Sequence, residues 1–101
     1  MTDWVWTYGG ICFGYRERIN LWTYDARHVG RFHGARIHAA DGCYLGELWR
    51  GRLIIDQANR SDRQAGFAPE PQRQPQGRYT GFVGPQLPRG LEDFSPPERV
   101  R

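Results

Sequence analysis

The sequence predicts an all-β fold of four pseudo-four-fold-related β-hairpins, about eight short strands, with an irregular C-terminal extension. A pattern of sixteen residues recurs along the first two thirds of the chain. Short runs of β-branched and aromatic residues alternate there with glycine and aspartate turns, which is typical of strands joined as hairpins. All seven prolines follow residue 68. We therefore expect a four-hairpin domain over residues 1–67 and a proline-rich extended tail over residues 68–101.

The repeat consists of an aliphatic residue, a tryptophan or its substitute, and a glycine eight positions after the tryptophan. The triplet Trp-Thr-Tyr occurs at residues 6–8 and again at residues 22–24. The aliphatic positions are Val5, Leu21, Ile37 and Leu53, and the glycines are Gly14, Gly30 and Gly46. Three copies in strict register predict three equivalent hairpins. A fourth copy fits if four residues are inserted before Ala65-Gly66-Phe67.

Each copy carries a turn between its two strands. Gly9-Gly10 and Asp41-Gly42 are typical two-residue hairpin turns, because glycine adopts a positive φ without steric cost. Asp25-Ala26 takes their place in the second copy, and since alanine fits a primed turn less well, we expect a different turn there. A longer polar loop at residues 57–63 replaces the tight turn in the fourth copy.

The repeated glycine needs an explanation, because glycine inside a strand lowers its stability. Two explanations are open. A bulky aromatic side chain such as Trp6 or Trp22 covers the glycine from the neighbouring strand, or the bare position lets a ligand or another backbone approach. Packing is the favoured explanation, since the glycine recurs wherever the strand pattern recurs.

Two stretches of the repeat resemble the unit of a known family. Residues 25–32 (DARHVGRF) and 41–48 (DGCYLGEL) look like a unit that combines a short strand, a DG-type turn and an aliphatic–Gly–x–aromatic strand. They are similar to the unit of the four-fold beta-flower proteins, which are small bacterial domains. The resemblance covers about residues 4–67. It implies four hairpins in a petal arrangement, and it implies no catalytic residue.

Composition and charge restrict the classes of function. No apolar run reaches the roughly 18 residues of a membrane-spanning helix, and the first residues lack a secretory pattern. The basic residues are all arginine and are interleaved with acids, so the net charge of +3 is weak support for a polyanion partner. Cys12 and Cys43 would form one disulfide or stay reduced. Reduction is the expectation for a chain that we predict to be bacterial and cytoplasmic.

The repeat places four residues of different chemistry in equivalent positions: Cys12, His28, Tyr44 and Gln64. A cysteine and a histidine near one axis suggest a metal site, but tyrosine and glutamine are poor zinc ligands, and a solvent-facing rim position is the alternative. His28, His33 and His38 are spaced by five, which places them on different strands or turns. We expect no metal, no cofactor and no catalytic residue, and therefore no enzyme.

The best candidate for binding is the run Trp49-Arg50-Gly51-Arg52 together with nearby Arg36. An aromatic ring flanked by guanidinium groups suits stacking on a nucleic-acid base and neutralising phosphates. The alternative is a tryptophan that ends a strand in the core, beside solvated turn arginines. We therefore expect a non-catalytic structural or protein-interaction module, with a nucleic-acid-binding module as the alternative.

The tail contains three distinct stretches. Residues 69–75 are rich in proline and glutamine and are expected to be extended and mobile. Residues 78–83 form a denser patch suited to adding a strand to the domain, and residues 91–94 form a short docking motif. These two stretches either recruit a partner by strand addition or cover the chain's own exposed edge, and covering is the favoured interpretation.

Overall fold

The computed structural model describes residues 2–75, 77–82, 84 and 86–100. Its strands form one antiparallel sheet in which each strand pairs with the next in chain order, which confirms the all-β prediction. The strands are β1 (Thr2–Trp6), β2 (Cys12–Glu17), β3 (Asn20–Thr23), β4 (His28–His33), β5 (Arg36–His38), β6 (Tyr44–Trp49), β7 (Arg52–Asp56) and β8 (Leu91–Asp93). Two short 3-10 helices are η1 (Gln57–Asn59) and η2 (Pro97–Arg99).

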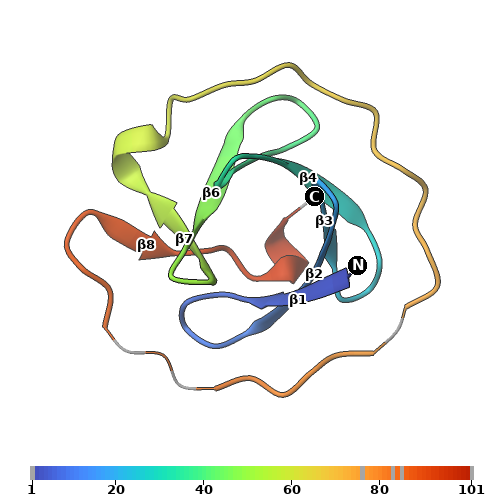
Figure 1. The fold of residues 1–101 in the computed structure, drawn as a ribbon, viewed down its shortest axis with the longest axis horizontal. Helices are drawn as coiled ribbons and strands as arrows, with labels where there is room; N and C mark the ends of the chain where they lie inside the picture. The colour runs from blue at the N-terminus through green and yellow to red at the C-terminus, as the bar shows by residue number, and fades with distance from the viewer. Residues whose placement is uncertain (1, 76, 83, 85, 101) are drawn as a thin grey trace.

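The sheet curls into a half-barrel that surrounds the C-terminal end of the chain (Figure 1). Thr7 forms an isolated parallel bridge with Leu53, and the Tyr8 amide donates to the Leu53 carbonyl over 3.0 Å. These contacts bring the end of β1 against β7. The residues after η1 run around the outside of the sheet, and the last residues with η2 then enter its centre (Figure 1).

The pairing register recurs in the first three hairpins. In each copy the aliphatic position pairs with the repeated glycine, a β-bulge follows, and the next residue pairs across the bulge. The pairs are Val5–Gly14 and Trp6–Cys12, then Leu21–Gly30 and Trp22–His28, then Ile37–Gly46 and His38–Tyr44. The sixteen-residue pattern in the sequence is therefore also a repeat of strand register.

The turns repeat with the same spacing. Within the hairpins φ is positive at Gly10, Ala26 and Gly42, and each of these residues donates its amide to the carbonyl three residues earlier. Ala26, at φ 66°, adopts the conformation of its glycine counterparts, so the expectation of a different turn in the second copy was wrong. The local hydrogen bonds hold alanine in a region that usually favours glycine. Between the hairpins φ is positive at Arg18, Gly34 and Arg50.

The repeated glycines make room for a neighbouring backbone. A Cβ on Gly14 would lie 1.9 Å from the carbonyl oxygen of Trp22, and a Cβ on Gly46 would lie 2.4 Å from that of Ile54. Both distances are far below van der Waals contact, so a side chain would push the next strand away. Close approach of the backbone therefore explains Gly14. At Gly46 the Phe94 ring also lies 2.5 Å from the same position, and at Gly30 the nearest atom, at 3.0 Å, belongs to the Ile37 side chain. An aromatic ring thus covers the repeated glycine in one of the three copies.

The fourth copy differs from the sequence-based expectation. Residues 65–67 do not return beside β7; instead the Phe67 amide donates to the Ala40 carbonyl over 2.9 Å. The partner of β7 is β8, with Ile54 opposite Asp93. The chain leaves β7 because the Asp56 carboxylate accepts the Ala58 amide and begins η1 there. A strand from the extension, far away in sequence, takes the place expected for residues 65–67.

The core contains the aliphatic positions of all four copies and two residues of the extension. Phe94 and Val100 are buried, and the Phe94 ring meets the Phe13 ring edge-on with centroids 5.2 Å apart. Burying a large apolar side chain contributes about 1.5–3 kcal/mol. The extension expected to be irregular thus supplies one strand and part of the core. The cluster comprises Val5, Phe13, Leu21, Val29, Phe32, Ile37, Leu53, Phe94 and Val100.

The described residues between η1 and β8, which we call the outer segment, are anchored at intervals to the sheet. The Arg73 amide donates to the Ala26 carbonyl over 2.9 Å, and its guanidinium lies 3.8 Å above the Trp22 ring and 3.0 Å from Glu17. Residues 78–82 form no strand, and Val83, which ends that predicted patch, lies outside the described residues. β8 does cover the edge of β7, as the favoured interpretation of the tail expected. In the part of the chain that is described, no helix has the length and apolar character needed to cross a membrane.

Candidate functional site

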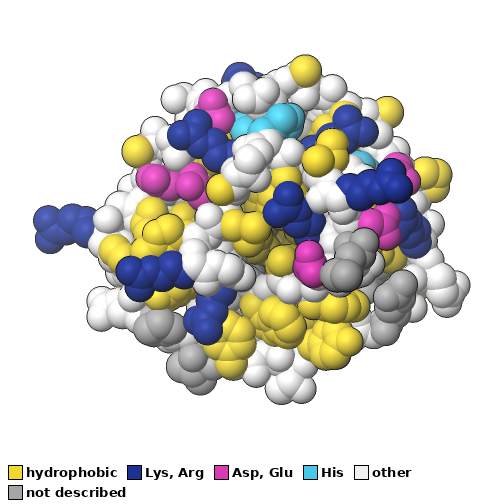
Figure 2. Space-filling model, viewed as in Figure 1, with side chains coloured by type: hydrophobic (Ala, Val, Ile, Leu, Met, Phe, Trp, Pro, Cys, Tyr) yellow, Lys and Arg dark blue, Asp and Glu magenta, His cyan; other side chains and the backbone are white. Residues whose placement is uncertain are grey.

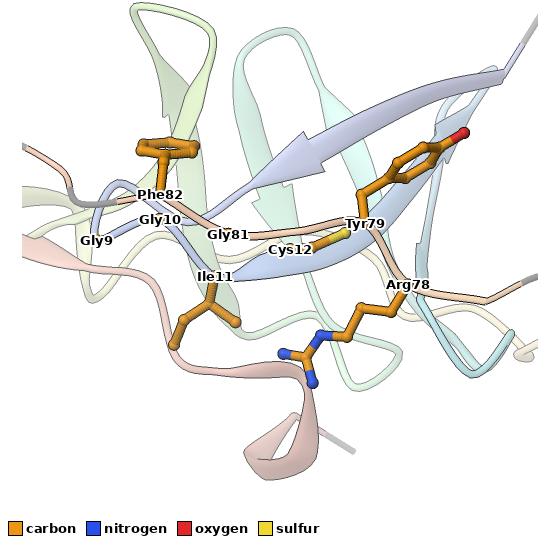
Figure 3. Close-up of a pocket in the computed structure, with 8 residues that line it drawn as sticks. All are labelled: Gly9, Gly10, Ile11, Cys12, Arg78, Tyr79, Gly81 and Phe82. Carbon is orange, nitrogen blue, oxygen red and sulfur yellow. The ribbon is translucent and has the colours of Figure 1, made fainter.

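A pocket of about 460 Å³ lies where the outer segment crosses the β1–β2 turn. This volume is in the range of ligand pockets, roughly 300–1,000 Å³. Figure 3 shows the rings of Tyr79 and Phe82 on one side of the outer segment, Ile11 and Arg78 on the other, and glycines between them. We call this region the strap surface; it is lined by Gly9, Gly10, Ile11, Cys12, Arg78, Tyr79, Gly81 and Phe82.

Backbone and side-chain contacts fix the two walls of the strap surface. The Phe82 amide donates to the Gly10 carbonyl over 2.9 Å, and the Trp6 indole Nε1 donates to the Thr80 carbonyl over 3.1 Å. A Cβ on Gly10 would lie 1.4 Å from the Phe82 carbonyl oxygen, so only glycine permits this approach. The Gly-Gly turn therefore serves the hairpin and also docks the outer segment.

Aromatic rings support the strap surface from β1. The Tyr79 ring lies 4.7 Å from the Trp4 ring, nearly perpendicular to it, and 6.1 Å from the Trp6 ring. Edge-on aromatic pairs contribute about 0.5–1.5 kcal/mol beyond the burial of their area. These contacts hold Tyr79 in place although its side chain is 56% exposed.

A row of arginines and aromatic rings continues from Phe82. The Arg52 guanidinium lies 4.2 Å from the Phe82 ring centre, and the Tyr8 ring lies 5.6 Å from the Trp49 ring. The Arg50 guanidinium then lies 4.5 Å above Trp49. Of the four residues expected to bind, Arg52 contacts the strap surface directly, and the half-buried Trp49 and then Arg50 lie further along the same row.

Arg36, the fourth predicted binding residue, belongs to another part of the molecule. Its guanidinium lies 3.4 Å from the Asp62 carboxylate. The same carboxylate oxygen is 2.9 Å from Nε2 of His38, a fully buried histidine. Sequence proximity to Trp49 was therefore a poor guide, because Arg36 pairs in the sheet with Glu47 and His33 and not with the β6–β7 turn.

The equivalent positions expected to form a ring behave differently from one another. Cys12 and His28 are buried, so the rim alternative was wrong for both. Burial lowers the pKa of His28, and its Nδ1 accepts the Glu70 amide. Burial also raises the pKa of Tyr44, whose hydroxyl donates to Glu47 over 2.7 Å. Gln64 stays outside the strands and donates its amide to Gly42.

Both cysteines of the chain are free thiols. Cys12 and Cys43 are not bonded to each other, and Cys43 Sγ lies 3.2 Å from the Arg63 guanidinium. Within the described ranges, no cluster of three histidine, cysteine or acidic residues is arranged to hold a metal ion. The structure does bring two of the three histidines together, since Nδ1 of His33 lies 3.1 Å from Nδ1 of His38.

The sequence singled out residues 78–83 as a patch suited to adding a strand, but it did not name Tyr79 and Phe82 as binding residues. The available signal was two aromatic residues within a segment otherwise rich in proline, glutamine and glycine. No protein-family model, no curated protein and no solved structure matches the chain. The resemblance to the four-fold beta-flower proteins therefore stays a prediction.

Proposed function

We propose that the chain is a non-catalytic protein-interaction module that binds its partner at the strap surface. The observation that carries this proposal is the clustering of exposed apolar residues. Of the four large hydrophobic side chains exposed in the described part of the chain, three line this one surface: Ile11 at 39%, Phe82 at 37% and Tyr79 at 56%. Figure 2 shows hydrophobic side chains gathered along the lower edge, where Figure 1 places this segment. Contiguous exposed apolar patches mark interaction sites.

The partner that fits best is an extended peptide with an apolar side chain and a nearby carboxylate. The apolar side chain would contact the Tyr79 and Phe82 rings, which stand on the same side of the outer segment. The carboxylate would face Arg52, which already lies 4.2 Å from the Phe82 ring centre. Aromatic and arginine side chains are enriched where binding energy concentrates in protein interfaces.

Nucleic acid is the second candidate, and the Arg50–Trp49 contact favours it. A tryptophan with a stacked guanidinium at the end of the row offers the combination used to bind single strands. Two features favour a peptide instead. Trp49 is half-buried against Tyr8, and Arg78 lies 3.8 Å from the Glu98 carboxylate, which would repel phosphate.

Panning a display library of random short peptides on the immobilised full chain tests the proposal. We expect enrichment of peptides that carry an aromatic or aliphatic residue close to Asp or Glu. Phe82→Ser should weaken their binding at least about tenfold, as expected for an aromatic residue at the centre of an interface. Ile19→Ser is the matched control, because Ile19 is 51% exposed in the β2–β3 turn, away from the strap surface.

Two results would overturn the proposal: no enriched peptide, or enriched peptides that bind Phe82→Ser as well as the unchanged protein. A labelled single-stranded oligonucleotide at about 50 mM salt is measured in parallel. Salt-sensitive oligonucleotide binding that Arg50→Ala weakens, without peptide enrichment, would instead establish the nucleic-acid alternative.

We also propose that the first three hairpins and the β7–β8 pair are the four petals of a pseudo-four-fold arrangement. The recurring register of the first three hairpins supports it. Bacterial origin and a cytoplasmic location remain predictions from the sequence.

A further inference from the structure

One histidine of the sheet contacts the outer segment in two ways. His28 is the first residue of β4 and is buried, and its Nδ1 lies 2.9 Å from the backbone nitrogen of Glu70. Its ring also packs on two aromatic rings, with centroids 5.0 Å from Trp22 and 5.1 Å from Phe67. Since Phe67 and Glu70 both belong to the outer segment, a single buried side chain holds this segment by a hydrogen bond and by ring packing.

The hydrogen bond determines the protonation of His28. A backbone amide nitrogen only donates, so Nδ1 of His28 carries a lone pair and accepts from Glu70. The ring is therefore neutral, with its one proton on Nε2. A second proton would occupy Nδ1 and point at the N–H group of Glu70. Two donors would then face each other, and the hydrogen bond would be lost.

The surroundings of His28 also disfavour a charged ring. Burial lowers the pKa of His28, and the guanidinium groups of Arg31 and Arg73 lower it further. The Glu70 carboxylate and the Gly30 backbone act in the opposite direction, but the pKa stays below its usual value. The Glu70 carboxylate is also 3.5 Å from the Arg73 guanidinium, so part of its charge is already compensated.

The two guanidinium groups stand beside the rings that pack on His28. Arg73 lies 3.8 Å from the centre of the Trp22 ring, and Arg31 lies 4.5 Å from the centre of the Phe67 ring. A charged His28 would be a third cation in this group. The titratable and charged groups on the elements around His28 are Tyr15 and Glu17 on β2, Asp25 and Arg27 before β4, Arg31 on β4, and Glu70 and Arg73 in the outer segment.

We propose that His28 is an acid-sensitive latch: its neutral ring holds residues 67–70 of the outer segment on β4, and its protonation releases them. The hydrogen bond to Glu70 requires an unprotonated Nδ1, and the Phe67 ring packs on the same side chain. Release brings the ring into water, where its charge is solvated. The strap surface is not involved, because the Gly10 carbonyl holds the Phe82 amide separately.

The direction of the pH effect follows from the two pKa values of His28. In the released form the pKa is the ordinary value of about 6.5, and in the latched form it is lower. The latch is therefore most stable above about pH 6.5 and weakens as the pH falls below this value, because only the released form then gains a proton. The ratio of released to latched molecules rises about tenfold per pH unit until the pH reaches the lower pKa of the latched form.

Amide hydrogen exchange of the full chain, measured from about pH 7.5 to about pH 5, tests the latch. We expect the protection of the Glu70 amide, relative to an unstructured peptide at the same pH, to be constant above about pH 6.5 and to fall about tenfold per pH unit below it. The Phe82 amide, which is bonded to Gly10, should keep its protection. This internal reference distinguishes release of residues 67–70 from unfolding of the whole chain.

Two matched variants identify the titrating group. His28→Asn keeps an oxygen near the position of Nδ1 that accepts a hydrogen bond but does not titrate in this range, so the protection of Glu70 should become independent of pH. His33→Asn makes the same change at an exposed histidine of the same strand and should leave the pH dependence at Glu70 unchanged.

Four results would overturn the proposal. They are constant protection of Glu70 down to about pH 5, an equal decline in His28→Asn and the unchanged protein, loss of the pH dependence in His33→Asn, and a parallel decline at Phe82. Nitrogen NMR of the His28 ring in the unchanged protein adds a test that needs no variant. At neutral pH we expect no proton on Nδ1, and a proton found there would equally overturn the latch.

Discussion

The three regular hairpins of residues 2–49 and the segment of residues 57–100 are held in place by different kinds of contact. In the hairpins every strand pairs with its neighbour in sequence, and the pairing recurs every sixteen residues. The later segment is held by contacts between distant residues. Trp6 donates to Thr80, and the Arg27 guanidinium donates to the carbonyls of Val100 and Pro97, each over 2.7 Å. Local periodicity specifies the first region, and individual long-range contacts specify the second.

The largest effect is expected where the later segment enters the core. Phe94→Ala removes a buried ring that packs on Phe13 and fills the space beside Gly46. We expect the free energy of unfolding to fall by about 3–5 kcal/mol, the usual cost of such a cavity. Urea denaturation measures it. Ile19→Ala, at an exposed site, should change the value by less than about 0.5 kcal/mol. Equal stability of Phe94→Ala and the unchanged protein would show that the extension is no part of the folded unit.

The second effect tests the repeat itself. Gly14→Ala places a methyl group 1.9 Å from the Trp22 carbonyl and forces β2 and β3 apart, so we expect a loss of about 2–3 kcal/mol. Gly51→Ala is the matched control, because its Cβ meets open space although φ is 78°. It should cost about 1 kcal/mol through backbone strain alone. A smaller loss for Gly14→Ala than for Gly51→Ala would contradict the account of the repeated glycine.

These two regions also differ in how far the sequence predicted them. The sixteen-residue spacing predicted the hairpins and the equivalence of Cys12, His28 and Tyr44, because strand register is a local property. The sequence favoured residues 91–94 as cover for an exposed edge, but it did not predict that β8 would pair with β7 or that Phe94 would be buried, since nothing in a short apolar stretch says which distant strand it joins. A periodic pattern carries no information on contacts that occur once.

The candidate site shows the same limit. Trp49, Arg50 and Arg52 lie in one row that continues from Phe82, whereas Arg36 contacts Asp62, so the grouping of these four residues by sequence does not match their contacts. The strap surface depends on the close contact between Gly10 and Phe82. No pattern in the sequence around either residue predicts that contact. The meeting of His33 with Asp62 through His38 likewise depends on how the loop after η1 folds back.

A smaller effect is expected from acid. The hydrogen bond from His38 lowers the pKa of Asp62 in the folded chain, so the stabilisation is present above the unfolded pKa and is lost as pH falls through the folded one. Asp62→Asn should therefore show a shallower loss of unfolding free energy below about pH 4 than the unchanged protein. Urea titrations at several pH values check this. The hairpin carboxylate Asp41, whose pKa is lowered by the Cys43 amide, provides the comparison with Asp41→Asn.

Amide hydrogen exchange at Phe82 and Arg73 tests most directly whether the outer segment stays hydrogen-bonded to the rest of the protein in solution. Their amides donate to the carbonyls of Gly10 and Ala26, each over 2.9 Å. We predict that both amides exchange far more slowly than the neighbouring amides of Gln72 and Gly81, in the full chain at neutral pH. Exchange at the rate of an unstructured peptide at both positions would mean that the segment leaves the sheet, and that the strap surface does not persist in solution.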